Sequence, residues 1–394
     1  MQPEFESHLM PIVKRPAPVM VRGAGSYLWD EGGARYLDFI QGWAVNALGH
    51  APPEVVAALS EQAAKLLTPS PALHNAPQLA LARRLVQLSG LHQACFVSSG
   101  AEAVEVAIKL ARKWGRLHRG GAYEIVTTLG AFHGRTLAAM AASGKPGWDA
   151  LFPPALPGFT KVAFGDVDAM RAAITDRTAA LLVEPIQGEG GVVVPPAGYL
   201  GALRELADER GVLLMLDEIQ TGMGRTGHVF AHQADGIRPD VMTLGKGLGG
   251  GVPIAATLAS ERASVFEPGD QGGTYAGNPL TTATALAVVD VICEPEFLQT
   301  VRQRGEELSQ GLASVSERHG GAQVRGRGLL WALRLGAPVA ELVRDACLAR
   351  GLLVNAAQSD VLRFMPSLRV SSGEIAQMLA CLDGALSRVA DQAA

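Results

Sequence analysis

Between residues 94 and 258, short apolar runs alternate with longer segments of helical period. This alternation limits the possible folds more than any other feature, because it is typical of a mostly parallel sheet covered by helices. The predicted strands are 94–97, 123–128, 179–185, 211–218, 240–245 and 253–259. Since ligands in such sheets bind beyond the carboxyl ends of the strands, residues that follow these runs are the first candidates for a site.

The two ends of the chain follow a different pattern. Residues 27–39 read YLWDEGGARYLDF, which predicts a strand pair joined by a Gly-Gly turn. From about residue 280 onward, amphipathic helical segments alternate with two further strand-like runs, at 324–335 and 361–370. The 394 residues exceed what one hydrophobic core usually organises. We therefore expect a large cofactor-sized domain and a smaller α+β domain.

Composition narrows the class of partner. With 48% hydrophobic and 18% charged residues, the chain can bury a substantial core and does not resemble a disordered protein. Its net charge of −4 includes no long block of one sign, which argues against a nucleic acid or an anionic membrane as partner. The first ten residues lack a basic region followed by an apolar stretch, and no apolar run approaches the ~18 residues that span a bilayer. We expect a cytoplasmic protein with a small-molecule partner.

The four cysteines are Cys95, Cys293, Cys347 and Cys381, and they lie far apart in the sequence. None has the paired spacing of a zinc site, and a chain of this size does not depend on disulfides. We expect reduced thiols and no metal.

A small polar turn follows the first predicted strand. Ser98, Ser99, Gly100 and Ala101 directly precede a helical segment. Free N–H groups and the positive end of the helix dipole attract a phosphate there, and small residues permit its close approach. The alternative is an ordinary serine N-cap.

Two further strand ends carry Asp217 and Lys246. A buried carboxylate needs a partner, and one candidate for Asp217 is the ring nitrogen of a pyridine cofactor, whose protonated form it would favour. The alternative is the magnesium-binding acid of a nucleotide hydrolase, but the required G-x-x-x-x-G-K-[ST] motif is absent from the sequence. Lys246 lies in TLGKGLGGGVPIA, where desolvation would lower its pKa and free the amine to form an imine. A solvated surface lysine is the other interpretation.

Two arginines and a glutamate complete the candidates. Arg135 and Arg363 are single cations in apolar-rich stretches, suited to forked binding of a carboxylate. Glu189, in EPIQGEGGV, could pair with one of them. Taken singly, each of the three also fits a structural role.

Together these stretches resemble the class III aminotransferases, and most closely their acetylornithine and ornithine transaminase branch. The shared motifs, in family order, are SGAEAVEVAIKLAR, FHGRT, VEPIQGEGG, LDEIQTGMGRTG, PDVMTLGKGLGGGVPIAA, GGTYAGNP and RFMPSL. The resemblance implies the fold type I of pyridoxal-phosphate-dependent transferases, an α/β fold with a mostly parallel central sheet. It implies a large cofactor-binding domain at residues 46–280 and a small domain made of residues 1–45 and 281–394. It also implies a homodimer with active sites at the subunit interface.

The resemblance also implies roles for individual residues. Lys246 would carry pyridoxal 5'-phosphate as a Schiff base, Asp217 would pair with its ring nitrogen, and Gln220 would bond its ring hydroxyl. Phe132 would stack on the ring, and Thr274 from the neighbouring subunit would help to hold the phosphate. The implied cofactor-binding set is Ser99, Gly100, Ala101, Phe132, His133, Asp217, Gln220, Lys246 and Thr274. The implied substrate-binding set is Arg135, Glu189, Arg363 and Trp43, with Arg135 and Arg363 on the substrate carboxylates and Glu189 pairing with Arg363 while the amine donor is bound.

The sequence departs from the family pattern at three places. Residues 273–277 read GTYAG, where such enzymes show a Ser-Thr pair before an aromatic residue and two glycines. Trp43 stands where a tyrosine or a smaller aliphatic residue is expected, so that an indole either reshapes the pocket or packs in the core. Residues 69–71 read PSP in a stretch that is usually less stiff.

The predicted reaction moves the ω-amino group of N-acetylornithine, or of a related ω-amine, to 2-oxoglutarate, giving glutamate and a semialdehyde. Ornithine and 4-aminobutyrate transaminases share most of these motifs and remain alternatives. An aminomutase would not need two carboxylate-binding arginines. A non-catalytic regulator that binds the cofactor would need an added DNA-binding segment with basic charge, for which neither terminus has room.

Overall fold

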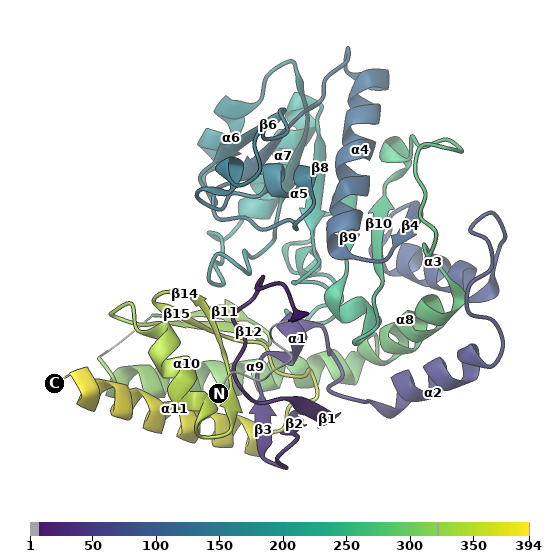
Figure 1. The fold of residues 1–394 in the computed structure, drawn as a ribbon. Coiled ribbons are helices and arrows are strands. Elements are labelled where there is room, and N and C mark those ends of the chain that lie inside the picture. The colour runs from purple at the N-terminus through teal and green to yellow at the C-terminus, as the bar shows by residue number, and fades with distance from the viewer. Residues whose placement is uncertain (1–7, 321–322, 394) are drawn as a thin grey trace.

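The computed structural model describes residues 8–320 and 323–393. Residues 1–7, on which part of the expectation about the N-terminus rests, lie outside the described residues. Figure 1 shows two lobes: one contains the large sheet and its covering helices, and the other contains the two smaller sheets and the C-terminal helices.

The large sheet has seven strands in the order β4-β10-β9-β8-β7-β5-β6. Their bounds are β4 Gln93–Val97, β5 Glu124–Thr128, β6 Phe159–Val162, β7 Thr178–Val183, β8 Leu213–Asp217, β9 Val241–Leu244 and β10 Ala255–Ala259. Only β10 runs against its neighbours in this sheet, so the expectation of a mostly parallel sheet is confirmed. All six predicted strands are present, with ends that differ by up to two residues.

Helices cover both faces of this sheet, so its strands are buried on both sides and read as continuous apolar runs. Along β7, Ala180 and Leu182 pack toward α4 (Gly100–His118), whereas Leu181 and Val183 pack toward α7 (Tyr199–Arg210). Each face is thus closed by its own hydrophobic cluster, and Figure 1 shows α4 and α7 on either side of the strands. The remaining helices of this region are α2 (Pro53–Ala63), α3 (Ala76–Ser89), α5 (Leu137–Ala142), α6 (Val167–Ala173) and α8 (Pro279–Ile292).

The smaller sheets join the two ends of the chain. One has the order β1-β2-β3-β13 and the other β11-β12-β15-β14. Their bounds are β1 Met20–Ala24, β2 Tyr27–Asp30, β3 Arg35–Asp38, β11 Gln323–Arg327, β12 Leu330–Arg334, β13 Leu352–Leu353, β14 Asn355–Gln358 and β15 Val361–Phe364. The predicted N-terminal strand pair is β2–β3, and Gly33 in its turn has a φ of +82° that favours glycine.

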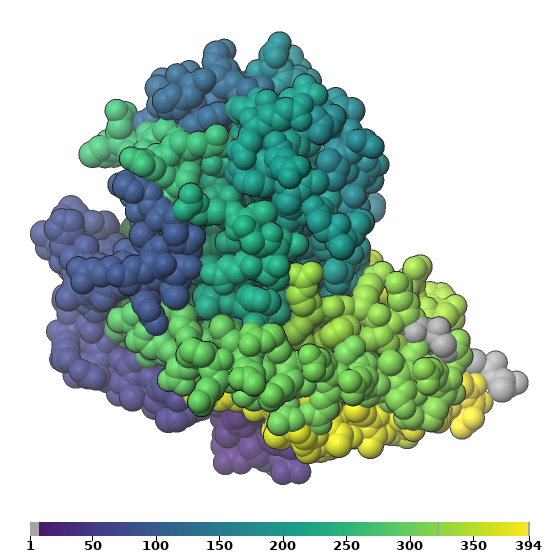
Figure 2. All heavy atoms as spheres, turned by 180° about the vertical axis from the view of Figure 1, so that it is seen from behind, coloured from purple at the N-terminus to yellow at the C-terminus, as the bar shows by residue number. Residues whose placement is uncertain are grey.

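The parallel pairing of β3 with β13 holds the N-terminal segment to the C-terminal one. The long helices α9 (Pro295–Arg318), α10 (Ala340–Leu348) and α11 (Ser372–Ala393) pack beside these sheets. Seen from behind, the first and last parts of the chain lie together below the lobe that holds the large sheet (Figure 2). The division at residues 45 and 280 stays a prediction, because the largest hydrophobic cluster joins side chains from both sides of those boundaries, Leu37 and Leu81 among them.

Among the described residues, no helix combines the length and apolar composition that crossing a bilayer requires. All four cysteines are free thiols, as expected.

Candidate active site

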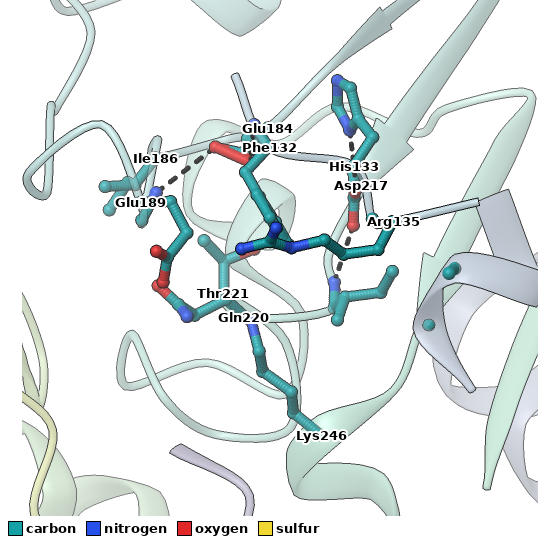
Figure 3. A pocket seen from close by; sticks show the side chains of 15 residues that line it. Phe132, His133, Arg135, Glu184, Ile186, Glu189, Asp217, Gln220, Thr221 and Lys246 are labelled. Atoms are coloured by element: carbon teal, nitrogen blue, oxygen red, sulfur yellow. Dashed lines mark hydrogen bonds and ion pairs between the residues drawn. The ribbon is translucent and has the colours of Figure 1, made fainter. Parts of the chain in front are cut away.

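A pocket of about 280 Å³ opens at the carboxyl ends of β5, β7, β8 and β9, where the N-terminus of α4 also points (Figure 3). Its lining residues are Gly100, Ala101, Phe132, His133, Gly134, Arg135, Glu184, Ile186, Gly188, Glu189, Asp217, Ile219, Gln220, Thr221 and Lys246. The position agrees with the expectation that a ligand site lies beyond the strand ends.

Asp217, the last residue of β8, is buried and fixed by three contacts. Its Oδ2 lies 2.7 Å from Nδ1 of His133, and its Oδ1 accepts hydrogen bonds from the Ile219 N–H and the Thr243 hydroxyl, both at 3.1 Å. Burial lowers the pKa of His133, but the hydrogen bond and charge of Asp217, with the charge of Glu184, outweigh it and raise that pKa. The carboxylate is therefore held in one orientation.

Glu184 follows β7 and is buried beside this pair. Its two carboxylate oxygens accept hydrogen bonds from the backbone N–H groups of Phe132, at 3.1 Å, and Gly188, at 3.2 Å. Burial raises the pKa of Glu184 to about 7, and the charge of Asp217 acts in the same direction. Glu184 can hence change its protonation state near neutral pH.

One ligand atom each of His133, Glu184 and Asp217 could be placed within 4.8 Å of the others, which is close enough for a metal ion. Two of the three are already hydrogen bonded to each other, and no thiol joins them in the described residues. Glu184 accepts backbone N–H groups instead, and all three residues line the pocket.

Lys246 comes after β9, between Gly245 and Gly247, and has a φ of +41°. A residue with a side chain is strained in this left-handed region, and such strain concentrates at functional sites. Figure 3 shows its side chain extending toward the middle of the labelled group. Burial lowers the pKa of the Lys246 amine, and the charge of Arg363 lowers it too, against the attraction of the acidic side chains around it. The result is an amine that loses its proton more readily than an ordinary lysine.

Arg363, on β15, has 0% of its side chain exposed and reaches the pocket rim from the small-sheet lobe. Its Nη2 donates to Glu189 Oε1 at 2.6 Å, its Nη1 to Gln220 Oε1 at 3.2 Å and its Nε to Asn355 Oδ1 at 3.0 Å. Burial raises the pKa of Glu189, but the charges of Arg363 and Lys246 outweigh it and lower that pKa. Glu189 is accordingly a carboxylate paired with a guanidinium.

The turn before α4 combines both interpretations made from the sequence. The Ser99 side chain accepts a hydrogen bond from the Glu102 N–H, and Glu102 Oε2 accepts the Ser98 and Ser99 N–H groups, which makes a capping box. The N–H groups of Gly100 and Ala101 come next, and helix geometry leaves them without intrahelical acceptors. A Cβ on Gly100 would lie 3.0 Å from Ile219, so a larger residue would press on the pocket wall.

The Phe132 ring lines the pocket, and a second aromatic ring packs against it from outside the lining. Phe132 meets Trp148 edge to face, with ring centroids 5.7 Å apart. The Arg135 guanidinium lies 5.0 Å from the Trp148 centroid, and the Lys145 amine lies 5.0 Å from that of Phe132. Figure 3 shows the Arg135 side chain crossing the pocket.

The structure brings together most of the site residues predicted from the sequence, and leaves four of them outside the pocket lining. Arg363 is one of the four, but it contacts the lining residues Glu189 and Gln220. Ser99 is exposed and serves as the N-cap. Thr274 is exposed, and its neighbours Gly272 and Gly273 line a separate groove of about 820 Å³. Trp43 is 47% exposed, so the interpretation that it packs in the core is wrong.

The lining residues that the sequence does not predict are Gly134, Glu184, Ile186, Gly188, Ile219 and Thr221. Glu184 had a signal, since it stands at the end of the predicted strand 179–185. Gly188 has no such signal, because the reason for a glycine there is a contact that only the folded chain reveals: a Cβ would lie 1.7 Å from Gln220 Oε1.

A lysine and a buried aspartate at the carboxyl edge of a parallel-rich sheet, in this fold, define a pyridoxal-phosphate-dependent transaminase. The family described as Aminotransferase class-III matches residues 12–386, and the chain belongs to this family. The resemblance seen in the sequence and the predicted fold class are thereby confirmed.

Known relatives cover nearly the whole chain. Acetylornithine aminotransferase 2 of Bordetella bronchiseptica is 52% identical over 97% of both chains. The N-acetylornithine aminotransferase of Stenotrophomonas maltophilia, a solved structure, is 38% identical with a TM-score of 0.86 and covers 98% of this chain and 99% of its own. The ornithine aminotransferase of Toxoplasma gondii, also solved, is 31% identical with a TM-score of 0.94 and covers 98% of this chain and 94% of its own.

Proposed function

We propose that the chain holds pyridoxal 5'-phosphate on Lys246 and transfers the ω-amino group of N-acetylornithine, or a related ω-amine, to 2-oxoglutarate. The products are glutamate and a semialdehyde. Relatives named acetylornithine aminotransferase at 48–52% identity support this substrate. The observation that carries the proposal is the Glu189–Arg363 pair at the rim of the pocket that Lys246 enters.

The pocket contains polar groups that fit this cofactor. In the described residues, Gln220 Nε2 and His133 Nε2 are buried without a hydrogen-bond partner, and such donors are costly to leave unpaired. Gln220 Nε2 suits the ring hydroxyl, while the N–H groups of Gly100 and Ala101, with the Ser99 turn, suit the phosphate. Asp217 suits the ring nitrogen, and Phe132 and His133 complete the wall. When bound, the cofactor supplies an electron sink for the carbon that carries the amine.

The protein's own groups then act at stated atoms. The Lys246 amine, with its lowered pKa, takes the proton from the carbon that bears the amino group and returns it elsewhere, which is typically worth about 10²–10⁴-fold in rate. Asp217, oriented by His133 and Thr243, would stabilise a proton on the ring nitrogen that faces it. Catalytic roles are hence proposed for Lys246 and Asp217.

Two substrates of different charge must use the same pocket. We assign Arg135 and Arg363 to substrate carboxylates, and Glu189 to neutralising Arg363 while the ω-amine is bound. A paired cation no longer demands an anion, so a donor without a second carboxylate is not penalised. When the dicarboxylate arrives, Glu189 leaves and Arg363 binds the anion.

We further propose a homodimer in which Thr274 of one subunit reaches the phosphate in the other. Two observations support this: Thr274 is exposed outside its own chain's pocket, and its neighbours Gly272 and Gly273 line a groove on the surface. Trp43 is proposed to border the substrate, since its exposed indole belongs to a turn that packs against the loop of Lys246.

Ornithine and 4-aminobutyrate remain the alternative donors. The high TM-score to an ornithine aminotransferase favours ornithine as the first of these to test. An aminomutase is less well supported, because transfer within one molecule does not need two carboxylate-binding arginines.

Single-turnover rates measured separately for acetylornithine and for glutamate test the proposal. Glu189→Ala should keep or improve the rate with glutamate and lose efficiency with acetylornithine, by about 1–3 kcal/mol in relative kcat/KM. Arg363→Ala should show the opposite bias. Glu61→Ala, which removes an exposed carboxylate paired with Lys65, is the matched control and should change neither rate. Equal losses for both substrates in Glu189→Ala would contradict the proposal, and a panel of amine donors with 2-oxoglutarate, read as glutamate formed, identifies the donor.

A further inference from the structure

Glu189 lies between two cations rather than one. Its Oε1 accepts the hydrogen bond from Arg363 at 2.6 Å, whereas its Oε2 lies 3.7 Å from the amine of Lys145. The second distance is too long for a hydrogen bond but within an ion pair. Each oxygen of the carboxylate consequently faces a different cation.

Lys145 is held in place by its surroundings. Its amine lies 5.0 Å from the centroid of the Phe132 ring and 5.4 Å from that of Trp148, both within the range of cation–π attraction. The backbone before it is fixed as well: Gly144 exchanges hydrogen bonds with Gly130 and Ala131, and a Cβ on Gly144 would lie 2.1 Å from a backbone oxygen of β5. Lys145 is thus a cation fixed beside the pocket, outside its lining.

The backbone of Glu189 is anchored too. Its carbonyl oxygen accepts a hydrogen bond from Gln358 Nε2 at 2.9 Å. A change of partner for the carboxylate therefore needs only side-chain rotation. Lys145 is the cation nearest to hand for such a change, since its amine already lies within ion-pair distance of Oε2.

We propose that Lys145 is a specificity-determining residue that receives the Glu189 carboxylate when a dicarboxylate substrate occupies Arg363. This inference rests on the proposed function, since it names the second position of the same carboxylate. Separating a carboxylate from its cation in a partly buried site costs free energy unless a second cation takes the place of the first. Glu189 is 23% exposed and Lys145 26%, so water replaces the lost partner only in part.

The consequence is a shift in population. The apparent affinity for a dicarboxylate is proportional to the fraction of molecules in which Arg363 is free to bind it. Lys145 increases that fraction by stabilising the rotated Glu189, and it does so without touching the substrate. Its loss should weaken dicarboxylate binding and leave the ω-amine half-reaction unchanged or slightly faster.

Glutarate is the probe, because it has both carboxylates of 2-oxoglutarate but no keto group that could react. Binding of glutarate to the holoenzyme is measured by calorimetry. Lys145→Met should weaken it by about three- to tenfold, the range expected for one partly exposed ion pair, and Lys145→Arg should restore most of the affinity. Lys65→Met is the matched control. It removes an exposed lysine that is distant in the sequence from Lys145, and it should leave the affinity for glutarate unchanged.

The Glu189→Ala background separates an indirect role from a direct contact. With no carboxylate to receive, Lys145→Met should have no effect on glutarate binding there. An equal loss in both backgrounds would mean that Lys145 contacts the ligand itself and would overturn the inference, as would unchanged affinity in the single variant. If Glu189→Ala shifts the preference between acetylornithine and glutamate as proposed while Lys145→Met leaves glutarate binding unchanged, the inference about Lys145 fails and the proposed function stands. If Glu189→Ala shows no preference either, the proposed function of this pair fails with it.

Discussion

Strands β8 and β9 carry buried carboxylates at both of their ends, Asp240 at one end and Asp217 at the other. Asp240 accepts hydrogen bonds from Arg204 at 2.8 Å, from Arg262 at 2.5 and 2.7 Å, and from the Leu214 N–H at 2.8 Å. Burial raises the pKa of Asp240, but the hydrogen bonds and charges of its partners outweigh this effect and lower that pKa. Both carboxylate oxygens of Asp240 thus have donors from the protein itself.

The Asp217 end is arranged differently. Buried donors on His133 and Gln220 have no partner within the described residues, Lys246 has a strained φ, and burial raises the pKa of Glu184 to about 7. One end of the strands is thus completed by the fold itself, and the other is completed only when a ligand arrives. The difference shows where this fold gains stability and where stability is given up for chemistry.

Lys246→Ala should produce the largest effect and confine it to the Asp217 end. Turnover should fall by at least about 10²-fold, because the group that transfers the proton is gone. The midpoint of thermal unfolding of the cofactor-free protein should not fall, since burial penalises the charged Lys246 amine. Lys65→Ala, at an exposed ion pair, is the control and should change neither quantity.

Asp240→Ala should lower the stability of the protein and leave its activity unchanged. The substitution removes the buried acceptor of Arg262 and of the Leu214 N–H and leaves Arg204 paired with Asp208 alone, so we expect a loss of about 3 kcal/mol in the free energy of unfolding. Activity per folded molecule, measured well below the unfolding midpoint, should stay near that of the wild type. Asp290→Ala, at a pair that is more exposed and 3.4 Å long, should cost no more than about 1 kcal/mol. Loss of activity without loss of stability in Asp240→Ala would end the contrast between the two strand ends.

The carboxylates at the two strand ends should also make the stability of the protein depend on pH in opposite directions. This effect should be smaller than that of either substitution above. The pKa of Glu184 is raised from 4.5 to about 7, so this residue's contribution to stability is full below about pH 4.5 and is lost as the pH rises through 7. Glu184→Gln should hence make the cofactor-free protein more stable by about 1–2 kcal/mol at pH 8, after the loss of one hydrogen bond, and not at pH 5. For Asp240 the pKa is lowered, so its contribution is present above its ordinary pKa and is lost on acidification. A stability difference for Glu184→Gln that is equal at both pH values would contradict the pKa assigned to Glu184.

Local sequence predicted the parts of the fold that depend on local pattern. The six predicted strands are all apolar runs that the sheet buries, whereas β6 was missed because its four residues FTKV include an exposed Thr160 and form an edge strand. The strand-end rule found Asp217 and Lys246, since both follow such runs directly.

Local sequence patterns do not predict contacts between segments that are distant in the sequence. The 3.7 Å approach of Lys145 to Glu189 joins a turn after α5 to a turn after β7. Neither residue has a local pattern that reveals the other. A serine N-cap is the alternative that the sequence offers at residue 99, and the structure shows that Ser99 adopts this role, within a capping box that it shares with Glu102.

The most direct test of the account is to reduce the purified yellow protein with borohydride and map the modified peptide. We predict that the imine absorption band disappears and that the cofactor becomes permanently attached to Lys246, the amine with the lowered pKa in the pocket. Attachment to another lysine, or no attachment at all, would contradict it.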